Sequence, residues 1–522
     1  MNSMNSNSPM PAVGIDLGTT YSVVSALDEQ GIPRSLPNAE GELLTPSAVL
    51  FEGEQVIVGR EALKAMGGDA IHVADCPKRY LGRRVYPRAL AGKEYPPEVL
   101  QAWILNKLRL DAAQRLGKFR QVVITVPAYF DEVRRKATQD AGYMAGFDVL
   151  DIINEPTAAA VAFGVQQGYL SESGEARKAQ NLMVYDLGGG TFDVTVMRIE
   201  GSEFKTLAPD GDVHLGGRDW DQRMVDFVAE EFLRRYTKDL RDDPNSAARV
   251  WRECEEAKRT LSTRVKATVA CDHEGDWVRT EITREQFESM TQDLLDRTSL
   301  TCQEALRAAG MDWGDLDRVL LVGGSTRMPQ VRKMLADLSG REPDHGISPD
   351  EAVAHGAAIR TGVLQSQFEG RPPKMKIQSV NSHSLGVVGR DRRTDRRRTA
   401  VLIPRNTPLP TSTKRLFRTH TENQRSILVQ IIEGENPNPD YCSSVGKCSV
   451  PALPKGLKAG SPIQVEFDYA ENGRLKVQVT VPGTEIHLAH ELRRENSLGQ
   501  EQLDQFRREI SGFPPPVIPL SS

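Results

Sequence analysis

The chain contains twice a pattern suited to holding phosphate, once as GIDLGTT and once as YDLGGGTFD. In each copy an apolar strand ends at an aspartate, Asp16 or Asp186, and a turn with glycine and threonine follows. Glycine lets the backbone approach an anion closely, and successive N–H groups can donate to it. The aspartates would then hold a hydrated Mg²⁺ that bridges phosphate oxygens. Two ordinary hairpins are the alternative, but the repetition with threonine in register favours phosphate.

A third segment, DRVLLVGGSTRMPQVRKML, has an apolar strand that runs into Gly323 and Gly324 and then a helix start at Ser325. Glycines at such a junction leave room for a flat ligand, such as a ribose or an adenine ring. The guanidinium of Arg327 could stack over its face. The pattern alone fits close packing of strand and helix equally well.

One helical face carries side chains that could bind the polar edges of a nucleoside. In WRECEEAKRTLS the spacing of three and four residues places Glu255, Lys258, Arg259 and Ser262 on that face. Its donors and acceptors suit ribose hydroxyls and adenine edges. Taken alone, a solvent-exposed face with Glu–Lys pairs is the simpler interpretation.

Two further helices begin with proline and continue with small residues, as NEPTAAAVAFG and SPDEAVAHGAA. Small residues let helices cross closely, which suits a contact between two lobes that hinge. Glu155 would then enter the cleft and reach the water shell of the metal. The alternative is tight helix packing, with Glu155 only capping its own helix.

These motifs require a domain that brings distant segments together, and the rhythm of strands and helices up to Gln365 is typical of an α/β fold. The repeated aspartate turn predicts a duplicated, two-lobed domain with a cleft between the lobes. After Gln365, alternating segments such as IQVEFDY predict a β-sandwich, and SLGQEQLDQFRREI predicts one short helix. The predicted divisions are a disordered tail at 1–10, a nucleotide-binding domain at 11–366, a linker at 367–378, a β-sandwich at 379–495, and a truncated lid and tail at 496–522.

Composition excludes several other classes of protein. The chain has 66 basic and 71 acidic residues and a formal charge of -5, which argues against a dedicated nucleic-acid or membrane-surface binder. The first residues lack a signal-peptide pattern, and no apolar run is long enough for a membrane span, so a cytoplasmic protein is expected. The six cysteines are expected to be reduced and structural, although pairing of Cys442 with Cys448 stays open.

The motifs taken together resemble the nucleotide-binding domain of the seventy-kilodalton heat-shock chaperones, the DnaK family. The resemblance rests on GIDLGTTYS, VPAYF, INEPTAAA, DLGGGTFD, HLGG, EEAKRTLS, LVGGSTRMP and PDEAVAHGAA, in matching order and spacing. It implies an actin-like, ribonuclease H-like ATPase domain followed by a peptide-binding β-sandwich. It also implies hydrolysis of ATP to ADP and phosphate with Mg²⁺, and K⁺ as a candidate second ion. Clients would be unfolded or extended polypeptides, and candidate partners are a specialised J-domain protein and a nucleotide exchange factor.

The family's roles can be carried onto matching positions of this chain. Thr19 and Thr191 would place hydroxyls at the γ-phosphate, Asp193 would lie near the attacking water, and Lys78 would orient that water. The metal would be held through water by Asp16, Glu155 and Asp186. The other nucleotide contacts would be Gly18, Thr20, Gly188, Gly189, Gly190, Glu255, Lys258, Arg259, Ser262, Gly323, Gly324, Ser325, Arg327 and Asp350. Pro127 and Arg135 would relay the nucleotide state to the second domain.

The β domain resembles the family more loosely and departs from it in several places. Val387, Phe417, Ile427 and Val429 match positions that line the family's peptide cleft. The apolar linker is replaced by PPKMKIQSV, the long helical lid is missing, and the loop over the peptide reads GRDRRTDRRRT. That arginine run would either be a solvated face or select acidic clients.

Two single positions also differ from the family's pattern. His420 stands where the arch over the peptide has a small residue, and Asp151 replaces an arginine that meets the aspartate of a J-domain. The resemblance therefore predicts that an ordinary J-domain fails to stimulate this chain. An ATPase chaperone is the leading hypothesis. A nucleotide-sensing scaffold with a fixed partner is the alternative, and a small-molecule kinase is a weaker one.

Overall fold

The computed structural model describes residues 10–514 except 169–177, 345, 347, 373–374, 392, 451–452, 471–473, 485–486 and 492–497. Most of the tail predicted at 1–10, part of the tail after the last helix, and Arg392 therefore lie outside the described residues. In the part of the chain described here, no helix is long and apolar enough to cross a membrane.

The first lobe is built on a mixed sheet whose path runs β3-β2-β1-β8-β9, with β4 paired to β2. Strand β1 is antiparallel to β2 and parallel to β8, and β8 is parallel to β9. The strands are β1 (Val13–Asp16), β2 (Tyr21–Leu27), β3 (Pro33–Leu36), β4 (Thr45–Pro46), β8 (Gln121–Val126) and β9 (Asp148–Asn154). Helices α2 (Pro97–Leu116) and α3 (Glu132–Met144) share a buried apolar cluster with this sheet.

The second lobe repeats this arrangement on a sheet of order β15-β10-β11-β12-β16. Its strands are β10 (Gln180–Leu187), β11 (Phe192–Glu200), β12 (Glu203–Asp212), β15 (Arg318–Val322) and β16 (Lys376–Gln378). Asp16 and Asp186 each stand at the carboxyl end of a strand that leads into an antiparallel partner. The duplication predicted from the repeated motif is thus visible in the topology of the two sheets.

Two helices pack between the lobes, α4 (Glu155–Gln166) and α10 (Ala352–Phe368). They cross so closely that a Cβ atom on Gly356 would lie 1.9 Å from the carbonyl oxygen of Ala158. A side chain there would push the helices apart, because real Cβ atoms do not approach backbone that closely. The small residues after NEP and SPDEA therefore serve the close crossing that the sequence indicated.

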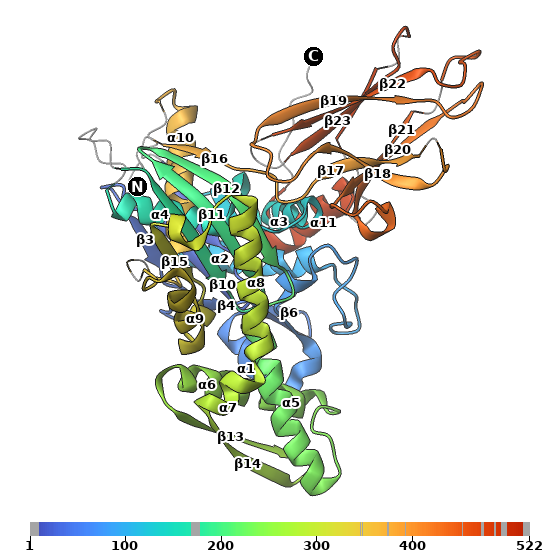
Figure 1. Cartoon of the computed structure of the whole chain (residues 1–522). Coiled ribbons are helices and arrows are strands. Elements are labelled where there is room, and N and C mark those ends of the chain that lie inside the picture. Colours follow the sequence, from blue (N-terminus) through green and yellow to red (C-terminus); the bar gives the residue numbers. More distant parts are fainter. Residues whose placement is uncertain are drawn as a thin grey trace, which may run out of the picture.

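Further elements surround the two sheets on the side of the cleft. Strands β5, β6 and β7 form a small sheet near α1, and the hairpin β13–β14 lies with α5, α6 and α7 at the far end of the molecule (Figure 1). Their bounds, with those of α8 and α9, are Ala48–Glu52 (β5), Gln55–Val58 (β6), Val73–Asp75 (β7), Arg60–Asp69 (α1), Lys266–His273 (β13), Asp276–Thr283 (β14), Gly217–Tyr236 (α5), Pro244–Thr263 (α6), Arg284–Met290 (α7), Gln292–Ala308 (α8) and Pro329–Ser339 (α9).

The β domain consists of two four-stranded sheets, β18-β17-β20-β21 and β19-β22-β23-β24, which bury one common apolar cluster. The strands are β17 (Leu385–Arg390), β18 (Arg397–Ile403), β19 (Thr411–Arg418), β20 (Ile427–Glu433), β21 (Ser443–Val450), β22 (Pro462–Tyr469), β23 (Leu475–Thr480) and β24 (His487–Glu491). Mixed sheets with helices, followed by two facing sheets, are compatible with the predicted fold class.

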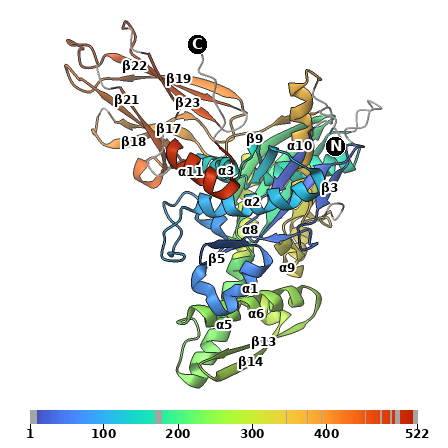
Figure 2. The same ribbon diagram turned by 180° about the vertical axis from the view of Figure 1, so that it is seen from behind.

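The predicted C-terminal helix is present as α11 (Gln500–Ser511), and it lies against α2 and α3 (Figures 1 and 2). Leu503 and Ile510 are 5% exposed and belong to the apolar cluster of the first lobe. Arg507 is buried, and its guanidinium lies 4.5 Å from the ring of Tyr143. In this arrangement the helix covers the nucleotide-binding domain and does not cover the β domain as a lid.

Candidate nucleotide cleft and its junction with the β domain

A cavity of about 1190 Å³ opens between the two lobes. Nearly all residues that the sequence assigned to nucleotide or metal line it. They are Asp16, Gly18, Thr19, Thr20, Lys78, Glu155, Asp186, Gly188, Gly189, Thr191, Glu255, Lys258, Arg259, Ser262, Gly323, Gly324, Ser325, Arg327 and Asp350. Gly190 and Asp193 are not in its lining. The folding of the chain thus brings together motifs that are far apart in sequence.

The two phosphate turns face each other across the cavity. A Cβ atom on Gly189 would lie 1.9 Å from the hydroxyl oxygen of Thr20, and one on Gly190 would lie 2.4 Å from a methyl carbon of Thr19. Only glycine permits this approach, because any side chain would strike the opposite turn. The backbone N–H groups of both turns can therefore converge on one anion.

The aspartates at the strand ends lie in a buried acidic cluster. Burial, and then the charge of Glu155, raise the pKa of Asp16 to about 7 and that of Asp186 well above its ordinary value. Asp16 accepts a hydrogen bond of 3.0 Å from Thr125. Carboxylates that are desolvated and close together are stabilised by a cation, so the cluster fits the hydrated Mg²⁺ that the sequence indicated. Within the described ranges, no three His, Cys, Asp or Glu side chains form a direct metal site.

Lys78 provides the opposite charge in this cluster. It lies in a short 3-10 helix (Pro77–Tyr80) and is 2% exposed. Its ammonium group donates to Glu155 Oε1 and to the carbonyl oxygen of Leu17, both at 2.6 Å. No local pattern marks this lysine, and only the resemblance singled it out.

Asp193 lies on β11 directly opposite Asp186 in the register of the β10–β11 pair. Its carboxylate accepts a hydrogen bond of 2.9 Å from the backbone N–H of Tyr129 and is 1% exposed. Burial, and then Glu155, raise its pKa to about 7. A carboxylate with such a pKa can accept a proton near neutral pH.

The helix face of α6 meets the strand-to-helix junction at the other end of the cavity. Arg259 donates to Glu255 at 2.6 Å and to the hydroxyl of Tyr21 at 2.9 Å. Arg327, more than half exposed, forms an ion pair of 2.6 Å with Asp350. The two arginines supply planar, partly exposed groups on which a flat ring could stack.

Three residues of this end, Asp221, Arg218 and Trp251, were not singled out from the sequence, whereas Lys258 was. Lys258 forms an ion pair of 2.8 Å with Asp221, and the guanidinium of Arg218 lies 4.5 Å from the ring of Trp251. All four line the cavity. Pairs of this kind become visible only when helices α5 and α6 are placed side by side.

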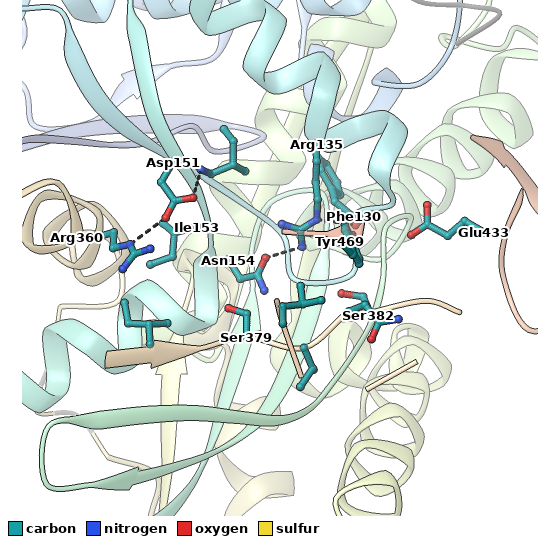
Figure 3. Close-up of a pocket in the computed structure, with 15 residues that line it drawn as sticks. Phe130, Arg135, Asp151, Ile153, Asn154, Arg360, Ser379, Ser382, Glu433 and Tyr469 are labelled. Atoms are coloured by element: carbon teal, nitrogen blue, oxygen red, sulfur yellow. Dashed lines mark hydrogen bonds and ion pairs between the residues drawn. The ribbon is translucent and has the colours of Figure 1, made fainter. Parts of the chain in front are cut away.

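A second, small cavity of about 30 Å³ lies where the first lobe meets the β domain (Figure 3). Arg135 lines it and donates to Asn154 Oδ1 at 2.6 Å and to the carbonyl oxygen of Ala128 at 3.2 Å. Ser382 of the β domain donates to the same carbonyl of Ala128. Arg135 and the residues after Pro127 therefore stand at the contact between the two domains.

Asp151 lines the same cavity, and its position bears on the prediction about a J-domain. The carboxylate is 9% exposed and forms an ion pair of 2.9 Å with Arg360 of α10 (Figure 3). A side chain turned inward to an arginine does not present a negative charge to a partner protein. This geometry gives no support to a direct repulsion between Asp151 and a J-domain aspartate, and the failure of an ordinary J-domain to stimulate the chain stays a prediction.

The linker is attached to the nucleotide-binding domain along part of its length. Within the segment predicted as linker, β16 adds to the edge of the second lobe by pairing in parallel with β12. Ile377 is buried there beside Met375 in the apolar cluster that α4 and α10 share. The altered linker sequence still docks on the nucleotide-binding domain.

The four residues predicted to line a peptide cleft belong to the apolar cluster of the β domain. Val387 and Val429 are buried, whereas Phe417 and Ile427 are partly exposed. Their contact with a peptide stays a prediction. All six cysteines are unpaired, so the Cys442–Cys448 disulfide that the sequence left open is not formed.

Comparison with known proteins places this geometry in a family. The family model described as Hsp70 protein matches residues 12–90 and 85–513. A "Chaperone protein DnaK" of Metamycoplasma hominis is 37% identical over 504 residues, 95% of this chain and 82% of that protein. Proteins of the same name are 37% identical in Halobacterium salinarum, over 95% of this chain and 77% of the relative, and 38% identical in Thermus thermophilus, over 95% and 83%. The chain belongs to the Hsp70 family.

Proposed function

We propose that the chain is an ATP-hydrolysing molecular chaperone that binds extended polypeptide through its β domain. The observation that carries the proposal is the pair of facing phosphate turns above a buried cluster of carboxylates with one lysine. ATP suits this site because its phosphates would lie between the turns and its adenosine would reach α6 and the Gly323–Arg327 junction. The membership in the Hsp70 family supports the same activity.

Different residues of the cleft would have different roles in phosphoryl transfer, according to where they lie. Bound Mg²⁺ would neutralise the charge of the phosphates. Asp16, Glu155 and Asp186 would hold it through water, as their buried cluster suits. Lys78 can donate to an attacking water or to a phosphate oxygen, and Thr19 and Thr191 can place hydroxyls beside it. Positioning and electrostatic stabilisation are most of what this reaction requires.

Asp193 is the candidate for accepting the proton of the attacking water. Its pKa of about 7 suits that role near neutral pH. The signal of the nucleotide state would pass along the helix of Arg135, which begins beside the β domain. We assign a J-domain co-chaperone, a nucleotide exchange factor and a cytoplasmic location as further parts of this proposal.

Single-turnover hydrolysis of ATP, with and without Mg²⁺ and with and without an unfolded peptide, tests the proposal. We expect hydrolysis that requires Mg²⁺ and that peptide accelerates. The Asp16→Asn and Asp186→Asn variants should lose Mg²⁺-dependent turnover, while Asp242→Asn, a change at an exposed aspartate, should retain it. Hydrolysis that is unaffected by the two cleft substitutions would show that the site lies elsewhere.

A further inference from the structure

Two connections of the β domain meet at one end of its sheets. One is the loop between β17 and β18, from Arg390 to Arg397, and the other joins β19 to β20. Asp395 Oδ1 of the first lies 3.8 Å from His420 Nε2 of the second, and both side chains are more than half exposed. The two loops therefore face each other, with the strands that carry Phe417 and Ile427 running into them.

The first connection carries an excess of positive charge, and so does strand β19, which runs into the second, in a chain whose formal charge is -5. The first has six arginines between Arg390 and Arg398 against two aspartates, and residues 414–425 have four lysines or arginines against one glutamate. The positive charge is therefore concentrated at this end of the β domain and is not a property of the whole molecule.

Some of these arginines are paired and others are not. Arg390, Arg397 and Arg398 lie within 4 Å of Asp395, Asp440 and Asp391. Such exposed pairs are weak because water and ions screen them, so a ligand carboxylate can compete for them. Arg393 and Arg396 are exposed, and neither forms an ion pair with another described residue.

The same region also offers apolar surface. Leu416 of β19 is 65% exposed and Leu428 of β20 is 60% exposed. The guanidinium of Arg415 lies 5.8 Å from the ring of Phe417, which is partly buried at the edge of the apolar cluster. Arginine and apolar side chains are thus interleaved on strand β19, and Leu428 adds apolar surface on β20, beside the arginine-rich first loop.

We infer that this end of the β domain selects extended polypeptides that carry acidic residues next to apolar ones. The inference rests on the proposed function and names its client class. Apolar client side chains lose exposed surface against the strands, while client carboxylates are attracted by the arginines of the first loop and by the basic side chains of β19. A polypeptide satisfies both features, whereas a nucleic acid uses only the charge. The attraction acts between exposed groups, so salt weakens it.

Fluorescence anisotropy with three labelled peptides tests the inference. The peptides share one leucine-rich centre and carry neutral, acidic or basic flanks. At low salt we expect the acidic peptide to bind about tenfold more tightly than the neutral one, because several weak exposed charge pairs act together. High salt should reduce this ratio to about twofold.

Two matched double variants separate a local effect from net charge. Arg393→Ala with Arg396→Ala should lower the acidic preference about threefold and leave neutral-peptide binding unchanged. Arg264→Ala with Arg279→Ala removes the same charge at the far hairpin, and should change neither. Unfolding temperature measured on each variant confirms that the fold is retained.

Each remaining outcome has a definite meaning. Equal binding of acidic and neutral peptides at low salt overturns the inference and leaves the proposed function standing. Failure of all three peptides to bind overturns both. A single-stranded oligonucleotide that displaces the acidic peptide at lower concentration than unlabelled peptide does would overturn the assignment to polypeptide.

Discussion

The nucleotide cleft and the basic loops of the β domain both depend on charged side chains, but they hold those charges differently. Lys78 and Asp186 are buried, and each is fixed by a strand end or a short helix. Arg393 and Arg396 stand on an exposed loop with freedom to change rotamer. A buried charge needs its partners in one geometry, whereas an exposed one can exchange partners with water and ions. Substitutions should therefore be costly in the cleft and mild in the loops.

The buried ion pair of Asp151 with Arg360, where the first lobe meets the β domain, provides the most severe test of the contrast between buried and exposed charges. Removing the Asp151 carboxylate takes from the buried Arg360 an ion pair of 2.9 Å. We expect Asp151→Ala to lower the free energy of unfolding by about 3–5 kcal/mol. Denaturant titration measures this loss.

Glu61→Ala provides the control for Asp151→Ala, because it breaks an exposed pair with Lys64 and should leave the free energy of unfolding almost unchanged. The double exchange Asp151→Arg with Arg360→Asp should recover part of the loss. Equal small losses in both single variants would contradict the contrast between buried and exposed pairs.

Within the cleft, Lys78→Ala should reduce the single-turnover rate of ATP hydrolysis about 10²-fold, equal to about 2.7 kcal/mol. The reason is that Lys78 is the only lysine within 3 Å of Glu155 among the described residues. Nucleotide affinity, measured separately by titration with a fluorescent analogue, should change little. Lys64→Ala, at an exposed lysine, should retain the wild-type rate, and a wild-type rate in Lys78→Ala would refute the assigned role.

The position of α11 can be tested by shortening one buried side chain. Leu503 is 5% exposed against the first lobe, so Leu503→Ala should destabilise the docked helix by about 2 kcal/mol. Hydrogen exchange should then become faster in α11 and in the facing part of α2. Phe368→Ala, at a side chain that is 73% exposed on α10, should leave both segments unchanged. If α11 acts as a lid, the Leu503 variant would instead change peptide dissociation and not exchange in α2.

The pH dependence of stability provides a milder test of the buried carboxyl groups of the cleft in the nucleotide-free protein. The pKa of Asp16 and of Asp193 is raised to about 7, above their ordinary value of 3.8. Between these values each of the two groups binds more protons in the folded chain than in the unfolded chain, so their contribution to stability falls as pH rises from about 4 to about 7. The slope should be on the order of 1 kcal/mol per pH unit for each group.

Mg²⁺ with ADP should oppose this loss, because a bound cation replaces the protons. Thermal unfolding at several pH values, with and without Mg²⁺ and ADP, measures both effects. Asp16→Asn should remove the part of the pH dependence that Asp16 contributes in the nucleotide-free protein. A pH dependence of stability that is the same with and without this substitution would contradict the raised pKa of Asp16.

Most of the residues assigned to the cleft from the sequence do line it, because the turns and the helix crossing around it require glycine in the backbone. Gly189 and Gly356 permit approaches that no other residue allows, so each marks a place where two segments must meet closely. The fold of two lobes followed from the repeated aspartate turn. Lys78 could be assigned only by resemblance, since its partners Glu155 and Leu17 are distant in sequence.

Other features depended on contacts between distant elements, and the sequence gives no sign of those. The sequence could not show that Asp151 turns inward, because its partner is Arg360, on a helix far along the chain. The position of α11 on α2 and α3 was equally invisible, since an amphipathic helix has an apolar face whatever it covers. The divergent linker showed no apolar run, yet three residues of it suffice for strand β16.

The smallest expected effect concerns the contact of Asp395 with His420, which links the β17–β18 loop to the β19–β20 connection. Asp395 and His420 are more than 60% exposed and 3.8 Å apart, so their interaction is worth at most about 1 kcal/mol. Asp395→Asn also frees Arg390, so an acidic peptide should associate slightly faster, and its dissociation rate should change no more than fivefold. Stopped-flow anisotropy resolves the two rates, with Glu422→Gln, another exposed acid of these connections, as the control. A loss of binding as large as the loss of turnover in Lys78→Ala would mean that these loops hold their charges as rigidly as the cleft does, and the contrast between the two regions would fail.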